Sequence, residues 1–224
     1  MARVTRNVRT YDHFCLIART LEQVGERWSL LVIRDLLTGP KRFTDLMKRL
    51  AGITPKTLTQ RLRELADAGV LTADREPGRR EVWYELTAAG RELEPIVDAL
   101  NWWGVRHAWR WPQPDEPLHA EHLLRAVTQA VDKTVDDHAP ARWHFRFPDE
   151  DYLVECDGHR WSLATTDPQA RTDVTVTATV ETFARFVFAP PGVPEPDIAV
   201  VGRTDAVQRF RRLIHAIADV VGRP

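Results

Sequence analysis

Cysteine and methionine are scarce in this sequence, and the scarcity of cysteine excludes several kinds of protein. The 224 residues include two cysteines and two methionines. Cys15 and Cys156 are far apart, and neither belongs to a CxxC pair. A disulfide framework and a cysteine zinc site are therefore not expected.

Long apolar runs and secretory leaders are also missing. No stretch of eighteen consecutive apolar residues occurs, so no membrane span is expected. The chain does not open with a charged and then apolar leader, which argues against a signal peptide. We expect a cytoplasmic chain of ordinary globular composition that has no membrane partner.

The common enzyme signatures are absent as well. The sequence holds no Walker loop, GxGxxG, HExxH or GxSxG, so we expect no enzyme and no cofactor. His119 and His122 have the spacing to chelate a metal from one helix face, but Glu116 and Glu121 beside them favour a solvated face, and no metal site is assigned. The acidic run 149–151 is interpreted as a turn.

The net charge of −1 conceals two halves of opposite sign. Residues 1–111 contain 19 Lys and Arg against 14 Asp and Glu, whereas residues 112–224 contain 12 against 18. The segment 112–117 holds three prolines, which break helices and stiffen a connector. We therefore expect a basic domain at 1–111 suited to a phosphate backbone, a proline-rich linker at 112–117, and an acidic domain at 118–224.

The first half has the pattern of a winged helix-turn-helix, an α-rich fold with a β-hairpin wing. Apolar residues recur with a helical period from Leu21 to Leu37, and Gly25 divides this stretch into two helices. A short amphipathic helix over 43–50 comes next, and Ala51-Gly52 closes it.

A recognition helix is expected to begin at Pro55. Thr54 is a good N-cap, and proline suits the first helical position. Leu58, Leu62 and Leu65 share the core face, which leaves polar side chains outward that suit base edges and phosphates. Strands at 70–74 and 81–86 form the hairpin, and its basic tip suits the DNA backbone or minor groove. The candidate DNA-binding residues are Arg42, Thr54, Lys56, Thr57, Thr59, Gln60, Arg63, Arg79 and Arg80.

Five ordered motifs make this half similar to a known family. They are GxRW at 25–28, RFxxL at 42–46, I[ST]xxxLxxRLxxLxxxG at 53–69, YxLTxxG at 84–90 and a Trp-Gly pair at 103–104. In this order they resemble the HxlR-type regulators among the MarR-like winged-helix proteins. The resemblance implies a homodimer that pairs through its first helix and the long helix after the wing, and that reads an inverted repeat. Independently, the apolar stripe of Leu93, Ile96, Val97, Leu100, Trp103 and Trp102 is broader than a small domain needs.

One position departs from that family. Members often carry Cys-Pro before the first helix, and some sense oxidants or electrophiles with this cysteine. Here Leu16 follows Cys15, and Arg19 is the only nearby cation. The thiol is interpreted as buried or interfacial, and a redox sensor is the alternative.

The second half has an α+β pattern. A helix is expected over 118–138, followed by alternating strand segments, a short helix at 181–188, a strand at 198–201 and a last helix capped by Thr204. This order resembles a sterol-carrier-protein-2-like (SCP2-like) domain, a sheet covered by helices, which implies a cavity for a small apolar ligand. The alternative is that the aromatic residues are simple core. The candidate lining residues are Trp143, Phe145, Trp161, Phe183, Phe186 and Phe210.

Two functions fit these patterns. The first is a homodimeric, sequence-specific transcriptional regulator, expected to be a repressor, that binds double-stranded DNA and responds to a small apolar effector in the second domain. The second is a lipid or small-molecule carrier or sequestering protein, in which the winged helix serves mainly dimerisation.

Overall fold

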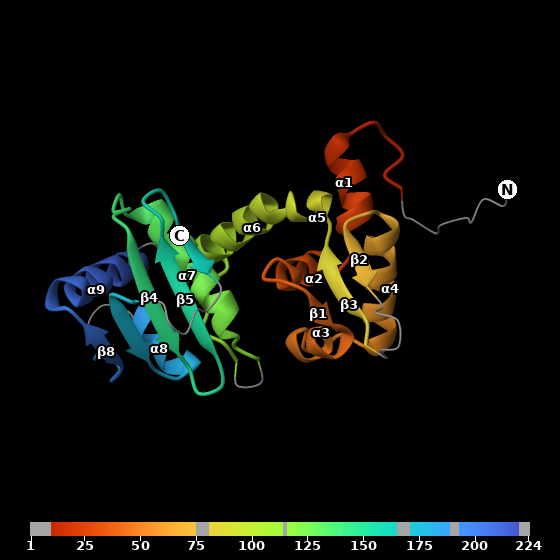
Figure 1. Ribbon diagram of the computed structural model, residues 1–224. Coiled ribbons are helices and arrows are strands. Elements are labelled where there is room, and N and C mark those ends of the chain that lie inside the picture. Colours follow the sequence, from red (N-terminus) through yellow and green to blue (C-terminus); the bar gives the residue numbers. More distant parts are fainter. Residues whose placement is uncertain (1–9, 75–80, 114–115, 165–170, 189–192, 220–224) are drawn as a thin grey trace. The chain divides into compact units, whose positions relative to one another are not determined.

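The chain forms two compact units, Met1–Val97 and Asp98–Pro224, in a computed structural model (Figure 1). The structure describes residues 10–74, 81–113, 116–164, 171–188 and 193–219. The division between the units falls within a helix and precedes the proline-rich segment 112–117. The two units are described in turn.

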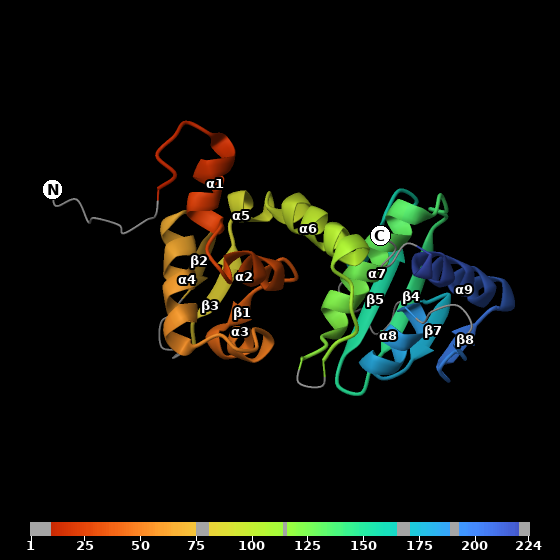
Figure 2. The same ribbon diagram turned by 180° about the vertical axis from the view of Figure 1, so that it is seen from behind.

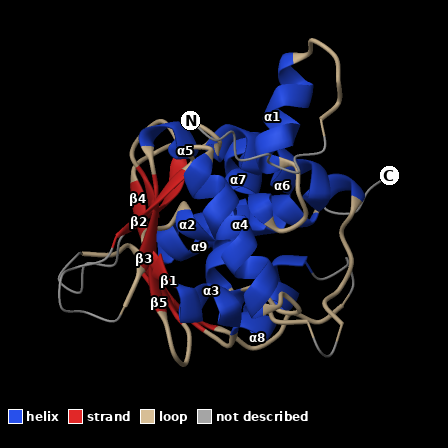
Figure 3. Cartoon of the chain, turned by 90° about the vertical axis from the view of Figure 1, so that its right-hand side faces the viewer, coloured by secondary structure: helices blue, strands red, loops and turns tan. Residues whose placement is uncertain are grey.

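The first unit combines helices with a small antiparallel sheet. Figure 3 draws helices in blue and strands in red. The strands have the order β1-β3-β2, with Arg42 opposite Trp83 and Leu71 opposite Leu86. The elements are α1 (Leu16–Val24), α2 (Ser29–Leu36), β1 (Lys41–Arg42), α3 (Phe43–Arg49), α4 (Pro55–Asp67), β2 (Leu71–Asp74), β3 (Trp83–Leu86) and α5 (Ala88–Arg91). This is the winged helix-turn-helix that the sequence predicts, and the wing tip 75–80 lies outside the described residues.

Two backbone constraints explain motifs of the first unit. Trp28 precedes α2 with φ of +83°, a left-handed conformation that is uncommon for a bulky residue. Gly90 lies against β2, where a Cβ would come within 2.0 Å of the Val70 carbonyl oxygen. The hydroxyl of Thr87 donates to the Gly69 carbonyl at 2.7 Å and accepts from the Gly90 N–H at 3.0 Å. Glycine is thus required where α5 meets the base of the wing.

The first core contains an unexpected carboxylate. Val32 and Leu36 of α2 are fully buried, as the helical spacing predicts, and Ile33 is buried with them although that spacing did not include it. Asp35 is buried beside them, with Arg34 at 3.2 Å and Arg49 at 3.7 Å. A charge buried this completely is tolerated only because cations pair with it. The Arg49–Asp35 pair connects α3, the first helix of the helix-turn-helix, to α2.

Helix α6 (Glu94–His107) contributes to both cores. Val97 is buried in the first core, and Leu93, immediately before the helix, packs against it. Farther along α6, Trp102 packs against the second core. Asn101 Nδ2 donates to Gln129 Oε1 at 2.6 Å, and Lys133 lies 5.9 Å from the Trp102 ring. The apolar residues predicted as one stripe therefore point in different directions: some pack in the first core, Trp102 packs against the second core, and others are exposed.

The second unit is a five-stranded sheet covered by three helices (Figures 1 and 2). Its strand order is β6-β5-β4-β7-β8, in which β4 and β7 are parallel and the other neighbours are antiparallel. The elements are α7 (Ala120–Thr134), β4 (Ala141–Arg146), β5 (Asp151–Cys156), β6 (Trp161–Ala164), β7 (Val174–Thr177), α8 (Val180–Phe188), β8 (Ala199–Gly202) and α9 (Thr204–Ala218).

Alternation along the strands builds the second core. Ala141, Trp143 and Phe145 of β4 are buried, while Arg142 and Arg146 are exposed. Val174 and Val176 of the neighbouring strand β7 are buried on the same core, which receives Phe210, Leu213, Ile214 and Ile217 from α9. The α+β order predicted from the sequence is confirmed, and turns over 148–150 and 157–160 connect β4 to β5 and β5 to β6.

Two ion pairs fasten the middle of α9 to the segment after α7. Arg209 Nη2 lies 2.8 Å and Arg212 Nη2 3.2 Å from the Asp137 carboxylate. Burial raises the pKa of Asp137, but the hydrogen bonds and positive charges of Arg209 and Arg212 outweigh burial, and the pKa lies below its ordinary value. The carboxylate therefore stays ionised and holds the two segments together.

Two local sequence predictions are corrected. Thr204 is the first residue of α9 and does not cap it; Arg203 holds the N-cap position without a side-chain cap, and Asp205 supplies the acid of the first turn. The strand β1 was not expected, because a two-residue strand has no periodicity to detect. Among the described helices, none is long and apolar enough to cross a membrane.

Candidate DNA-binding interface and second-unit pocket

Helix α4 is held rigidly from its first residue. The Thr54 hydroxyl accepts a hydrogen bond from the Thr57 N–H at 3.2 Å, and Pro55 begins the helix. Leu58, Leu62 and Leu65 are buried with at most 2% exposure. A helix fixed by a cap and three leucines can present its opposite face at a defined angle.

The exposed face of α4 carries two kinds of polar side chain. Two cations have no partner among the described residues, whereas several other polar groups form hydrogen bonds within the helix. Lys56 and Arg63 are exposed, and no ion pair or hydrogen bond of their side chains occurs within the described residues. Gln60 donates to Glu64 at 2.6 Å, and Thr59 donates to the Pro55 carbonyl at 2.8 Å. The hydroxyls of the two threonines at the cap, Thr54 and Thr57, share a 2.9 Å hydrogen bond.

Arg61 differs from Arg63, although both lie on α4. Its side chain is 13% exposed and pairs with Glu64 at 2.7 Å and Glu26 at 3.6 Å. These contacts tie α4 to the segment between α1 and α2. Arg61 therefore holds the helix in place, while Arg63 remains available to a nucleic acid.

Arg42 supports the wing. Its Nη1 lies 2.9 Å from Glu81 Oε1, its guanidinium lies 4.6 Å from the centre of the Trp83 ring, and its N–H donates to Asp45 at 3.1 Å. A cation that stacks on an aromatic ring and pairs with a carboxylate is partly committed already. The other wing candidates, Arg79 and Arg80, lie outside the described residues.

Two helices present apolar side chains to solvent. On α6, Ile96, Leu100 and Trp103 are 45%, 51% and 59% exposed and share one face by their spacing. On α1, Ile17 is 72% exposed, and Phe14 just before the helix is 84% exposed. Clusters of large exposed apolar side chains mark interaction surfaces.

The six aromatic residues predicted to line a cavity fill the second core instead. All six are at most 4% exposed, and their rings pack on one another. Trp143 lies 4.1 Å from Trp161 and 5.0 Å from Phe210, and Phe145 lies 5.1 Å from Phe183, between ring centroids. Phe186 stacks on Phe210 at 6.2 Å. Their spacing on strands and helices reflects core packing, which sequence alone could not separate from a cavity wall.

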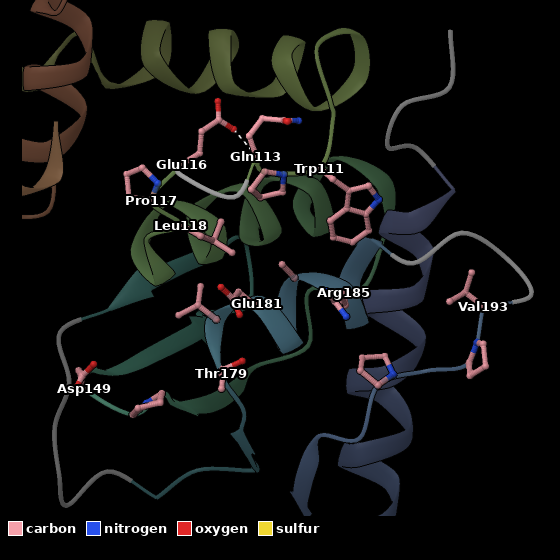
Figure 4. A pocket seen from close by; sticks show the side chains of 16 residues that line it. Trp111, Gln113, Glu116, Pro117, Leu118, Asp149, Thr179, Glu181, Arg185 and Val193 are labelled. Carbon is pink, nitrogen blue, oxygen red and sulfur yellow. Dashed lines mark hydrogen bonds between the residues drawn. The ribbon is translucent and has the colours of Figure 1, made fainter. Parts of the chain in front are cut away.

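A pocket of about 1240 Å³ does occur in the second unit, at other residues (Figure 4). It was missed in the sequence because its walls come from four separate segments. Proline is common to three of them, and this was the only available signal. The lining residues are Trp111, Pro112, Gln113, Glu116, Pro117 and Leu118 of the connector, Pro148 and Asp149 of the β4–β5 turn, Thr179, Val180, Glu181, Ala184 and Arg185 at α8, and Val193, Pro194 and Pro196 before β8.

Hydrogen bonds join the described connector residues beside this pocket. Arg110 pairs with Glu116, with Nη1 at 2.7 Å from Oε2, and the Gln113 N–H donates to the same oxygen at 3.0 Å. The Arg110 hydrogen bond and the Gln113 N–H lower the pKa of Glu116 to about 2. Trp109, just before the connector, packs against Phe188 at 4.1 Å between centroids, with the two rings tilted.

The two cysteines have different surroundings. Cys156 is buried on β5 and donates to the His138 carbonyl at 3.2 Å, and burial raises the pKa of its thiol. Cys15 is half-buried at the N-cap position of α1, where Arg19 stacks on the neighbouring Phe14 ring at 5.3 Å. The described residues contain no cluster of His, Cys, Asp or Glu that could hold a metal ion.

Comparisons with known proteins identify the first unit. A model of the HxlR-like helix-turn-helix matches residues 23–111. An uncharacterized HTH-type transcriptional regulator of Synechocystis sp. is 39% identical over 40% of this chain and 67% of its own length. The regulator YtcD of Bacillus subtilis, also uncharacterized, is 39% identical over 41% of this chain and 73% of its own length.

Crystal structures align to the same extent. One of a regulator named ytcD is 39% identical over 43% of this chain and 100% of its own, with a TM-score of 0.41. Other relatives are longer beyond the match: a Mycobacterium tuberculosis regulator is 39% identical over 45% of this chain, and the match spans 62% of its length.

Proposed function

Since the chain belongs to the HxlR-like helix-turn-helix family of DNA-binding transcriptional regulators, we propose that it acts as a homodimer that represses from an inverted-repeat operator and responds to an effector bound in its second unit. The observation that supports operator reading best is the exposed face of α4. There, Lys56 and Arg63 project without protein partners among the described residues, from a helix whose opposite face is buried. Arginine reads guanine through two hydrogen bonds, and lysine holds phosphates.

The proposed dimer is supported by the apolar faces of α1 and α6. A monomer leaves Phe14, Ile17, Leu100 and Trp103 in water. A two-fold interface would bury each face against its copy, and the free energy of burial is about 25 cal/mol per Å² of apolar surface. Two copies of α4 related by a two-fold axis match two half-sites of an inverted repeat. The proposed repressor role is one in which a dimer bound across the promoter excludes the polymerase.

The proposed response to an effector runs through α6. This helix carries the exposed apolar face and is also fastened to α7 by Asp98–Arg125 at 2.6 Å and Asn101–Gln129 at 2.6 Å. An effector that shifts the second core therefore acts on the helix that would form the dimer seam. Such coupling needs an effector with different affinities for the two dimer geometries.

For the second unit we retain the SCP2-like assignment as part of the proposal. It is supported by the order of the elements, which is one helix, four strands, a short helix, one strand and a last helix. The unit is assigned binding and not catalysis, so the protein is proposed to be no enzyme.

A mobility-shift assay on the DNA upstream of the chain's own gene tests operator binding. Arg63→Ala should weaken binding by about 1–3 kcal/mol, and Lys56→Ala should reduce the slope of log affinity against log salt by about 1. Arg146→Ala is the matched control, since Arg146 is also exposed but lies on β4 of the second unit. Affinity that is indifferent to salt and to Arg63→Ala would end the claim for α4.

A second candidate function is storage or transport of a small molecule, with the winged helix serving dimerisation. The specific observation in its favour is the pocket of about 1240 Å³. The two functions separate in one experiment: a carrier binds its ligand with the same affinity with and without operator DNA, whereas a ligand-responsive regulator does not.

A further inference from the structure

We propose that the pocket bordered by connector residues 111–113 and 116–118 binds an amphipathic organic cation, with the apolar body against the prolines and Trp111 and the positive charge near Asp149 and Glu181. This inference deepens the proposed function, because it names the site and chemical class of the effector. It also moves the ligand away from the buried aromatic core.

The apolar part of the pocket suits a rigid hydrophobic body. Pro112, Pro117, Pro148, Pro194 and Pro196 contribute ring surfaces from three segments. Trp111 lines the pocket and is 41% exposed, so part of its indole ring can contact a ligand. Prolines lose little conformational entropy when a ligand packs on them, which favours binding.

The polar part of the pocket carries an excess of negative charge. Glu116 is already paired with Arg110 and contributes no free charge. Asp149 and Glu181 are exposed, and neither side chain has an ion pair or hydrogen bond within the described residues. Among the described residues that line the pocket, Arg185 is the one cation, so the lining holds two unpaired carboxylates and one unpaired guanidinium.

This balance of lining charges favours a positively charged ligand over a negatively charged one. An organic cation gains attraction from the two carboxylates and from the π-face of Trp111. An anion of the same shape would meet both carboxylates and keep only Arg185. Figure 4 shows the connector side chains Trp111, Gln113 and Glu116 on one side of the pocket and Glu181 and Arg185 of α8 on the other.

The position of the pocket gives the ligand a mechanical role. Its connector wall follows α6 and Trp109, and the Trp109 ring packs against Phe188 at the end of α8. A ligand held between the connector and α8 would contact both segments at once. It would thereby stabilise one conformation of the connector, which is how differential affinity produces regulation.

Binding of tetraphenylphosphonium to the full chain, measured by calorimetry, tests the proposal against an isosteric anion. Tetraphenylborate has the same shape with the opposite charge, so the cation should bind at least about tenfold more tightly. The double variant D149N/E181Q should remove most of this preference. Asp136→Asn is the matched control, since Asp136 is an exposed carboxylate outside the pocket, and it should retain the preference.

The same samples are then assayed for DNA binding without ligand. Three results would overturn the pocket proposal: equal affinity for the two ions, a preference that D149N/E181Q does not change, or no binding of tetraphenylphosphonium. If those samples still bind the operator, the proposed DNA-binding function stands. If the protein binds the cation with the expected preference but does not bind the operator, the pocket proposal stands and the proposed DNA-binding function fails. A several-fold change of operator affinity with bound cation, absent in D149N/E181Q, supports the assignment of this pocket as the effector site.

Discussion

Arg125 of α7 donates two hydrogen bonds to one oxygen of Asp98 on α6, from Nε at 3.0 Å and from Nη2 at 2.6 Å. The arginine side chain is 16% exposed and the aspartate 32%, so water screens the pair only in part. This ion pair belongs to the attachment of α6 to the second core, on which the proposed coupling depends.

The first prediction concerns the energy of that attachment. Asp98→Asn and Arg125→Met should each destabilise the fold, and the double variant should lose about 1–2 kcal/mol less than the sum of the two, because charged hydrogen bonds contribute this much. Urea denaturation followed by tryptophan fluorescence measures the cycle. Effects that add to within about 0.3 kcal/mol would show that the pair contributes nothing.

A second prediction concerns the cap of α4. Thr54→Ala removes the acceptor for the Thr57 N–H and should cost about 1 kcal/mol, so hydrogen exchange at the start of α4 should accelerate about fivefold. Thr54→Ser keeps the hydroxyl and should exchange like the parent. Thr59→Ala is a second control, since among the described residues that hydroxyl bonds to the Pro55 carbonyl alone. Equal exchange in Thr54→Ala and the parent would refute a capping role.

The third prediction concerns the pH dependence of the connector. The pKa of Glu116 is lowered to about 2 by the Arg110 hydrogen bond and the Gln113 N–H. Since the folded-state value is depressed, the contribution of this carboxylate is complete above the unfolded value, near 4.5, and disappears as the pH falls through 2. Carbon-detected NMR titration should place its midpoint near pH 2, and in Arg110→Gln the midpoint should move back toward 4.5. A midpoint that Arg110→Gln does not move would contradict the assigned cause.

A fourth prediction distinguishes core from cavity wall. Phe183 is fully buried among Phe145, Phe147 and Phe186, so Phe183→Ala should destabilise the second unit by about 3–5 kcal/mol. Phe183→Leu keeps most of the volume and should recover much of the loss. A residue that lines an open cavity would tolerate alanine at little cost, and thermal denaturation decides between the two.

The recognition helix was predictable because its signals are local. Thr54-Pro55 and the spacing of Leu58, Leu62 and Leu65 specify the start and the buried face of α4 within one stretch of chain. Alternation specified β4 in the same way, since Trp143 and Phe145 point to one face. In both cases the backbone geometry and the burial depend on residues that are close in sequence, so the local pattern is enough to predict the element and its buried face.

The features that escaped prediction depend on contacts between distant residues. Strand β1 exists only because Lys41 and Arg42 find partners in Tyr84 and Trp83. Arg42 looked like a free DNA ligand, but Glu81 and Trp83 engage it from the wing. Likewise, sequence cannot show whether Phe145 and Phe183 contact each other or a ligand. The pocket joins segments from 111 to 196, and no periodicity connects them.

The last prediction concerns the apolar face of α6. Leu100 is 51% exposed between Ile96 and Trp103, so Leu100→Asp introduces a charge into the proposed dimer seam without disturbing a buried contact of the monomer. The dissociation constant of the dimer should rise at least about a hundredfold, because a buried unpaired carboxylate is strongly disfavoured in an interface. Sedimentation equilibrium measures this change.

Val201→Asp is the matched control, since Val201 is 68% exposed on β8 and belongs to neither α1 nor α6. The control should leave the association state unchanged. Operator affinity should fall in Leu100→Asp with the population of dimer and recover at high protein concentration, because each half-site alone binds weakly. A Leu100→Asp protein that sediments like the parent would place the seam elsewhere, and a monomeric parent with full operator affinity would remove the dimer from the mechanism altogether.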